Sequence, residues 1–507
     1  MRFELEAVFE FSKDMEENKK LVAEVLEKAD KELLKRGAPK GMEDEAASIE
    51  KWSISGDRLT LLIKSGRHVR ATSALLRLRN QFNLLGEKTK AGIRKIEIKK
   101  LVVDGIELKK KPAAPVKISF FVDELEIKGD KAKIRISNSI SIDAIEKGAV
   151  DRIIELVNEK IERQGYEGKE EIKKLLWSSK EKKVLYEEDP SVELEKKDWI
   201  RRTGAKGQFV YGTNFTSLVN AFKSILIDYI YKPLKFREMI FPKFEPWEVP
   251  KKSGHAKSIY PDAYYVMVPK VSSPKEWEAS MDYFKITGEV NKELIMDKVD
   301  SIGILSYAQC PPFWQYLEGR TVDDSSLPIK VYDWSGPTYR NEAGGTHGIA
   351  RVEEFHRIET LFVGYPEQVR DIGKKVEEKL GYIFDEVLGI EMKKYSVVPW
   401  WMAQEGEKEL KESSEGIGTV DFEAYMPYKG KREKSEWLEV QNVSIIGDKY
   451  PKAFSVKGRK PELWSGCAGG SFQRWICAFL AQKGFDLKNW PEEVKKRVKL
   501  GEEVRFA

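Results

Sequence analysis

The first part of the chain carries apolar side chains at strand-like intervals. Residues 3–9 place one at every second position, which predicts a strand with one buried face. A helix is expected from about residue 13 to residue 36, with Ser12 as its N-terminal cap. Turn residues such as Gly and Asp then separate short apolar runs, which we expect to be strands at 52–54, 59–63, 101–103, 106–108 and 116–122, with a further pair around Gly129. With a closing helix at 142–163, these segments predict a mixed α/β domain over residues 1–165.

Residues 166–198 are rich in charge and poor in aromatic residues, which indicates a linker. After it, we expect a helix at 214–231, a strand at 237–240 and a short helical insertion at about 273–299. Strand patterns then follow one another at 329–333, 339–342, 351–363, 420–425, 437–444 and 463–468. Because these strands are consecutive rather than alternating with helices, residues 199–507 predict an α+β domain with an antiparallel sheet flanked by helices.

Composition adds few constraints. The 507 residues are 41% hydrophobic and 34% charged, and 88 basic against 83 acidic residues give a net charge of only +5. We find no run of about 18 apolar residues and no signal-peptide pattern, so we expect a cytoplasmic protein that does not enter a membrane. The three cysteines lie far apart, which argues against a disulfide framework and leaves metal binding or simple burial open.

The clearest concentration of positive charge is a basic stripe at residues 67–100. Its candidate contacts are Arg67, Arg70, Arg77 and Arg79, on a segment whose apolar spacing fits an amphipathic helix. Such a face could follow a phosphate backbone. An ordinary solvated helix face explains the same pattern equally well.

The most informative segment is 338–359, which reads as a hairpin. Arg340 and Glu342 would share one face of the first strand, a glycine-rich loop would follow, and the second strand would return Arg351, Glu353 and Phe355. Guanidinium groups bind phosphate and an aromatic ring stacks on a purine, so this surface suits a nucleotide. The alternative is a surface hairpin with cross-strand ion pairs.

This segment resembles motif 2 of the class II aminoacyl-tRNA synthetases. Residues 469–475, Gly-Gly-Ser-Phe-Gln-Arg-Trp, resemble motif 3, and residues 214–242 resemble motif 1, with Pro242 as its proline. The order of the three motifs is correct. The wider pattern, which includes Cys310-Pro-Pro-Phe-Trp-Gln, His356-Arg-Ile-Glu359, Glu439-Val-Gln-Asn442 and Ser465-Gly-Cys467, is similar to the methanogenic-type seryl-tRNA synthetases over the whole chain.

The resemblance implies a role for each motif residue in binding ATP. Arg340 would hold the α-phosphate and Arg351 the γ-phosphate, while adenine would lie between Phe355 and Arg474. Glu342 would face the adenine edge or the aminoacyl group. Arg340, Glu342, Arg351 and Arg474 are thus the expected catalytic residues, and they act by alignment and charge stabilisation without a general acid or base.

The same resemblance implies two metals and a serine site. Glu439 and Asn442 would contribute to binding ATP through magnesium. Cys310, Glu359 and Cys467 would hold one zinc per subunit, with a fourth position open for the amino group of serine. Trp400, in a loop expected to order over serine, and Asn442 and Ser444 are the other expected serine contacts.

The family therefore implies a homodimeric seryl-tRNA synthetase that uses ATP, serine and tRNA(Ser), with the basic stripe and the N-terminal domain binding the tRNA. Two alternatives remain open from the sequence. One is an amino-acid ligase that loads a carrier protein, although the N-terminal domain speaks against it. The other is a non-catalytic tRNA-binding paralogue, which would be expected to lose motif arginines or metal ligands that this chain retains.

Overall fold

The computed structural model describes residues 1–164, 172–342, 344–398, 416–460 and 462–502. The chain divides into two compact units, Met1–Glu170 and Glu171–Ala507. Within the described residues, no helix is both long and apolar enough to cross a membrane.

The first unit is built on a six-stranded antiparallel sheet with the order β2-β3-β1-β4-β6-β5. Its strands are β1 (Arg2–Phe11), β2 (Ala47–Ser55), β3 (Arg58–Ser65), β4 (Ile93–Glu107), β5 (Val122–Lys128) and β6 (Lys131–Ile136), and its helices are α1 (Lys19–Lys28), α2 (Ala71–Thr89), α3 (Ile142–Glu146) and α4 (Ala149–Arg163). Helix α2 covers the sheet through Phe82, whose ring meets the edges of Phe9 and Phe11 with centroids 5.1 and 6.0 Å away. The alternation predicted for residues 3–9 is present, because β1 buries Phe3, Leu5, Ala7 and Phe9.

Four local expectations for this unit were wrong. No strand covers 116–122, because β5 begins only at Val122. Ser12 does not cap a helix; its hydroxyl accepts a hydrogen bond from the Gly92 N–H, and α1 begins only at Lys19. Residues 101–108 form no hairpin, because β4 continues through Gly105 with a shift in register, and Gly105 takes the positive φ that such an irregularity favours. The closing helix is broken in two at Gly148, which is left-handed.

The second unit contains a nine-stranded sheet. Eight strands have the order β10-β14-β16-β20-β19-β18-β17-β7, and β15 pairs with β16 beside this path. The strands are β7 (Ile172–Ser178), β10 (Arg237–Glu238), β14 (Ile329–Asp333), β15 (Pro337–Tyr339), β16 (Glu354–Gly364), β17 (Met392–Val398), β18 (Gly418–Ala424), β19 (Leu438–Gly447) and β20 (Trp464–Ser471). All pairs are antiparallel except β10 with β14.

Helices α6 (Thr213–Leu226), α11 (Pro366–Tyr382) and α14 (Phe472–Lys483) pack on this sheet through a large apolar core. Trp475 of α14 lies at its centre, 4.5 Å from the Phe384 ring and 6.1 Å from the Phe222 ring. Shorter elements complete the unit: α5 (Pro190–Lys196), β8 (Ile200–Arg202), β9 (Phe209–Tyr211), α7 (Glu248–Ser253), α10 (Pro311–Leu317), α13 (Lys449–Ala453) and α15 (Glu492–Lys495). The antiparallel sheet flanked by helices that the sequence predicted is confirmed.

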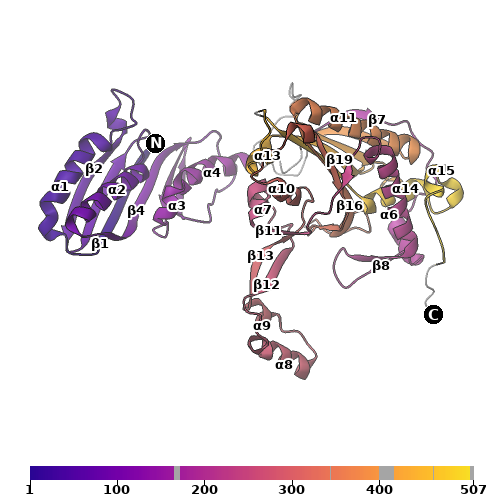
Figure 1. The fold of residues 1–507 in the computed structure, drawn as a ribbon, viewed down its shortest axis with the longest axis horizontal. Coiled ribbons are helices and arrows are strands. Elements are labelled where there is room, and N and C mark those ends of the chain that lie inside the picture. The colour runs from indigo at the N-terminus through magenta and orange to yellow at the C-terminus, as the bar shows by residue number, and fades with distance from the viewer. Residues whose placement is uncertain (165–171, 343, 399–415, 461, 503–507) are drawn as a thin grey trace. The chain divides into compact units, whose positions relative to one another are not determined.

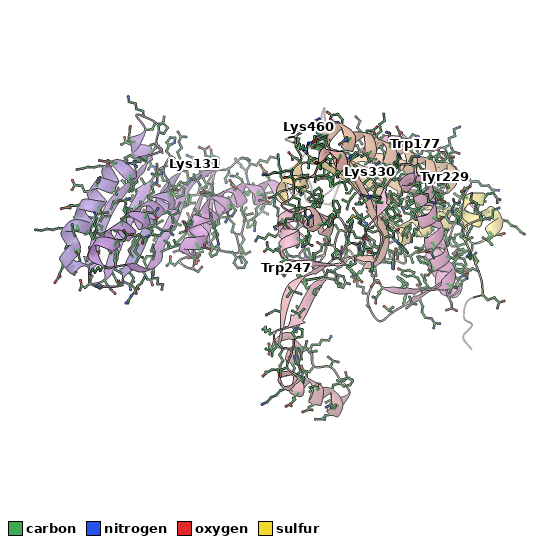
Figure 2. All side chains as sticks on the ribbon, viewed as in Figure 1. Lys131, Trp177, Tyr229, Trp247, Lys330 and Lys460 are labelled. Carbon is green, nitrogen blue, oxygen red and sulfur yellow. The ribbon has the colours of Figure 1, made fainter. Side chains whose placement is uncertain are left out.

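The segment expected to be a linker is partly built into this unit. Strand β7 pairs with β17 at the edge of the large sheet, and α5 follows with Asp189 as its cap. The helical insertion lies on an arm. There β13 (Val299–Leu305) pairs with β11 (Phe244–Pro246) on one side and with β12 (Tyr265–Pro269) on the other, and β12 and β13 carry α8 (Glu278–Thr287) and α9 (Lys292–Met296) at their far end (Figure 1). Trp247 lies where the arm joins the rest of the unit (Figure 2) and donates to the Ser301 carbonyl.

Candidate active site

Strand β16 organises the site. It pairs with β20 on one side and with β14 and β15 on the other. Its residues Phe355, Arg357 and Glu359 are two apart and therefore project from the same face. Phe355 and Arg357 line a pocket, whereas Glu359 is almost fully buried beyond it. One strand thus connects an open polar pocket with a buried group of metal-ligating atoms.

The pocket is open to solvent, and its empty space, including the open mouth, amounts to about 580 Å³. Most of the residues that the sequence assigned to ATP line it, along with backbone from β20: Arg340, Glu342, Ala350, Val352, Phe355, Arg357, Glu439, Val440, Asn442, Gly469, Gly470, Ser471 and Arg474. Three arginines therefore face the same space as an aromatic ring and two acidic side chains. This arrangement suits a polyanion that carries a flat ring.

Tyr307 holds the Arg340 side chain in position through two contacts. Its Nε donates to the Tyr307 carbonyl at 3.3 Å, and its guanidinium carbon lies 4.5 Å from the centre of the Tyr307 ring. Its backbone N–H donates to the Glu353 carbonyl at 2.9 Å. A guanidinium fixed in this way retains outward-facing donors for an anion without the entropy loss of a free side chain.

Arg474 lies in the first turn of α14, which Ser471 caps by accepting a bond from the Arg474 N–H. Its Nη1 donates to the backbone carbonyl of Glu439 at 3.0 Å and to the Glu439 carboxylate at 3.2 Å. Both bonds come from the same nitrogen and anchor that end of the guanidinium against β19. Arg474 therefore presents a flat cationic surface to the pocket.

The expected alternation of Arg351, Glu353 and Phe355 on one surface was wrong, because β16 begins only at Glu354. In the loop before it, Val352 faces the pocket and Glu353 is buried, where Tyr264 donates to it and the Lys206 ammonium lies 3.0 Å away. Arg351 is not among the residues that line the pocket. Its Nε lies 3.7 Å from Glu342, and its side chain is 47% exposed.

Cys310, Glu359 and Cys467 are brought together from three elements. They lie at the start of α10, on β16 and on β20, and their ligand atoms are all within 4.8 Å of one another. Burial raises the pKa of Glu359, and the nearby Arg357 guanidinium opposes this effect. The pKa of the Cys467 thiol is raised by its hydrogen bond with Cys310, by burial and by the Glu359 charge. Two thiols and a carboxylate at this spacing are a ligand set that zinc accepts.

The expected serine contacts lie next to this group where the structure describes them. Asn442 and Ser444 are two apart on β19, opposite Gly469 and Cys467 of β20 respectively. Asn442 lines the pocket, whereas the Ser444 hydroxyl lies 2.9 Å from the Thr419 hydroxyl. Trp400 lies outside the described residues.

Sequence reasoning overlooked Arg357, whose guanidinium contacts Glu359 and which lines the pocket. Its position two residues from both Phe355 and Glu359 was the signal that could have identified it. Tyr307 and Lys206 were also overlooked. Both come from other segments of the chain, and no local pattern associates them with motif 2.

In the first unit, the basic stripe is largely engaged with its own domain. Arg70 forms an ion pair with Asp151, and Arg79 donates to both Glu146 oxygens at 2.9 and 3.1 Å. Arg77 donates to two backbone carbonyls, both at 2.8 Å, in the segment that follows α1. Arg67 is exposed in the loop before α2.

Comparison with known proteins defines the class first. Residues 297–483 match the tRNA synthetase class II core domain (G, H, P, S and T), and residues 1–159 match a tRNA-binding domain. The fold is therefore that of a class II aminoacyl-tRNA synthetase that carries an N-terminal tRNA-binding domain. The fold class predicted from the sequence agrees with both matches.

The particular family follows from full-length relatives. The chain is 42% identical to the type-2 serine–tRNA ligase of Methanococcoides burtonii and 43% identical to that of Methanothrix thermoacetophila, in each case over 98% of both chains. The structure of M. kandleri SerRS in complex with A. aeolicus tRNASec matches with a TM-score of 0.83 and 27% identity, over 98% of this chain and 96% of that one. The chain belongs to the type-2 serine–tRNA ligases and is an enzyme of that class. The two alternatives left open by the sequence are thereby set aside.

A buried carboxyl group lies beside Ser306 and Tyr307, the residue that holds Arg340. Glu245 of β11 is 1% exposed, and its Oε1 has no hydrogen-bond partner among the described residues. Burial raises its pKa to about 8, although Ser306 and the Tyr307 N–H partly offset the shift. These partners place Glu245 beside the segment that holds Arg340. With a pKa of about 8, its carboxyl group is protonated over much of the neutral pH range.

We expect Glu245→Gln to remove part of the pH dependence of stability. The folded pKa of about 8 exceeds the ordinary value of 4.5, so the folded chain binds more protons than the unfolded chain between these values, and the free energy of unfolding falls as pH rises through them. Between pH 5 and pH 8 the free energy of unfolding of the wild type should fall by roughly 2 to 4 kcal/mol more than that of the variant. Denaturant unfolding followed by tryptophan fluorescence measures this difference. Glu248→Gln, an exposed neighbour, is the control, and equal pH profiles for both variants and the wild type would refute the assignment.

Proposed function

We propose that this enzyme joins serine to ATP as seryl-adenylate and then transfers the seryl group to the 3′ end of tRNA(Ser), with zinc recognising the amino group of serine. The observation that carries the proposal is the spacing along β16. Phe355 faces the pocket suited to a nucleotide, and Glu359, four residues further on, belongs to the metal-ligating group. A nucleotide and an amino acid bound at these two places would meet near Arg357.

For ATP, we assign adenine to the space between the Phe355 ring and the Arg474 guanidinium. Arg340 binds the α-phosphate, where its support by Tyr307 favours alignment. Arg351 reaches the γ-phosphate from the loop, which its exposure permits. Glu342, which also lines the pocket, faces the adenine edge or the aminoacyl group.

For magnesium, Glu439 and Asn442 are the proposed contacts, directly or through water, since hard cations prefer oxygen ligands. Both residues line the pocket. The Glu439 carboxylate lies 3.2 Å from Arg474, but the Arg474 bond to the Glu439 backbone carbonyl does not involve that carboxylate. The carboxylate can therefore turn towards a cation while Arg474 stays in place.

For zinc, the residues present fit the ion. Two sulfur atoms and one carboxylate oxygen lie within 4.8 Å of one another, and they are mostly buried. Three such ligands leave a fourth position, and zinc bound there would act as a Lewis acid that holds the neutral amino group of serine. Asn442 and Ser444, opposite Gly469 and Cys467, are the proposed contacts for the rest of the amino acid together with Trp400.

The chemistry requires alignment more than proton transfer. A serine carboxylate oxygen attacks the α-phosphorus, and pyrophosphate leaves with the electron pair of the broken P–O bond. Arg340 stabilises the charge that develops on the α-phosphate oxygens. A ribose hydroxyl at the 3′ end of the tRNA then attacks the seryl carbonyl carbon, its proton passes to a phosphate oxygen of the adenylate, and AMP leaves with the electron pair of the broken C–O bond.

We also propose how the enzyme assembles, where it is located and what each of its domains does. A homodimer would form through motif 1, where Ile240, just past β10 at the edge of the sheet, is 80% exposed. Residues 1–165 would bind tRNA and residues 199–507 would catalyse both steps, with 166–198 between them. We place the enzyme in the cytoplasm.

Arg474→Ala should reduce serine-dependent exchange of pyrophosphate into ATP by about a thousandfold, because one wall of the adenine site and its positive charge are lost. Arg459→Ala, which removes a surface ion pair with Asp323, is the matched control and should behave as the wild type. Exchange by Arg474→Ala within threefold of the control would contradict the ATP assignment.

Cys467→Ser should lose bound zinc and raise the KM for serine while changing the KM for ATP little. Metal analysis of the purified protein gives the first result and pyrophosphate exchange the second. The control is Cys477→Ser on α14, because Cys477 is also buried but contacts Tyr428 rather than the metal-ligating group. Equal zinc content in the two variants would remove Cys467 from the site.

Arg67→Gln should weaken tRNA binding and reduce its salt dependence by about one unit of slope, as expected for one lost phosphate contact. Arg77→Gln should instead lower the stability of the first unit, because it removes bonds to two backbone carbonyls. Filter binding over a series of salt concentrations, paired with thermal unfolding, separates the two effects. The same salt slope for Arg67→Gln and the wild type would exclude Arg67 from the tRNA interface.

A further inference from the structure

We propose that Gln473 is a positioning residue that sets the separation between the two walls of the adenine site. This inference rests on the proposed ATP site and extends it to a residue that does not touch the nucleotide. Gln473 is fully buried at the start of α14, between Phe472 and Arg474 in sequence. It does not line the pocket itself.

The side chain of Gln473 makes a two-point contact with His356 of β16. Its Oε1 accepts a hydrogen bond from the His356 backbone N–H at 3.0 Å, and its Nε2 lies 3.1 Å from the His356 Nδ1. Burial lowers the pKa of His356, so a neutral ring can accept from the Gln473 amide. Two bonds to one residue restrict rotation as well as distance.

The neighbours of these two residues form the proposed walls. Phe355 precedes His356 on β16, and Arg474 follows Gln473 on α14. Because consecutive strand residues face opposite sides, His356 points away from the face that carries Phe355. Its ring lies instead beside Tyr211, 5.8 Å away and nearly perpendicular. The contact between Gln473 and His356 therefore joins α14 to β16 on the side of the strand that faces away from the pocket.

The β16–β20 ladder sets Arg357 opposite Ser471, the residue just before α14, and Gln473 extends this link into the first turn of the helix. Arg474 is held to β19 through Glu439, and Trp475 donates to the Val440 carbonyl of the same strand at 3.1 Å. These bonds join α14 to β19 and do not involve the strand that carries Phe355. The described side-chain bonds between the first turn of α14 and the start of β16 are those of Gln473. An adenine ring stacked between Phe355 and Arg474 requires a narrow range of distances between these two side chains. Loss of the Gln473 contact should therefore weaken binding of the adenine base specifically.

The chain offers a matched control on the same helix. Gln482 is also buried, and its side chain likewise makes several hydrogen bonds to backbone, accepting from the Glu391 N–H and donating to the Glu391 and Tyr425 carbonyls. It lies more than two helical turns from Gln473, since a turn is about 3.6 residues. Gln473→Met and Gln482→Met therefore remove comparable buried bonds, but only the first acts next to the pocket.

The experiment measures binding of ATP and of inorganic triphosphate to each full-length variant by calorimetry. Gln473→Met should bind ATP at least about tenfold more weakly than Gln482→Met, as expected for a loss of about 1.4 kcal/mol. Its affinity for inorganic triphosphate and its KM for serine should match the control within twofold. Gln473→Asn, which keeps the amide but shortens its reach, should show the same selective loss if the methionine variant does not fold.

Equal ATP affinity in Gln473→Met and Gln482→Met, or equal losses for ATP and triphosphate, would overturn the positioning role. Phe355→Leu and Arg474→Ala test the proposed site independently. If neither weakens ATP binding, the ATP site itself is wrong, and the role of Gln473 fails with it. If both weaken ATP binding and Gln473→Met does not, only the positioning role fails.

Discussion

The pairing of β16 with β20 is the constraint on which the pocket and the metal-ligating group both depend. In this register Arg357 lies opposite Ser471, Glu359 opposite Gly469 and Leu361 opposite Cys467, so one thiol is set close to the buried carboxylate. Gly469 and Gly470 have no side chain, and a Cβ there would overlap Arg357 and Gln441 respectively. Gly469 therefore leaves room for Arg357 and Glu359 of β16, and Gly470 leaves room for Gln441 of β19 and Trp475 of α14.

The polar groups of the site are costly to bury, and the fold offsets that cost locally. Glu359 faces Arg357, Glu353 faces Lys206 and Tyr264, and Arg340 rests on the Tyr307 ring and carbonyl. Truncating one partner of such a group leaves the other buried and unpaired, which is far less favourable than the pair itself. These contacts keep the pocket residues in position before any substrate binds, so little ordering remains to be done on binding.

The predictions that succeeded rest on short-range regularity. The alternation of β1, the antiparallel sheet flanked by helices and the order of motifs 1, 2 and 3 all follow from residues close together in sequence. The failures occurred where a local pattern was interrupted by a distant partner or by one backbone torsion. Ser12 bonds to Gly92 instead of capping a helix, Gly105 bends one strand instead of starting a turn, and β16 begins too late to bring Arg351 and Glu353 onto its face.

The sequence by itself determined the class of fold, the membership of a family and most of the polar residues that line the pocket, since these depend on periodicity and on motifs read from contiguous residues. For Cys310, Glu359 and Cys467 the family resemblance gave the set, and the tertiary structure brings their ligand atoms together. Only the tertiary structure decided that Tyr307 supports Arg340 and that Gln473 forms hydrogen bonds with His356. The physical reason is that sheet register and helix docking set these distances. Both are properties of the whole packed core, and they leave no spacing signal along the chain.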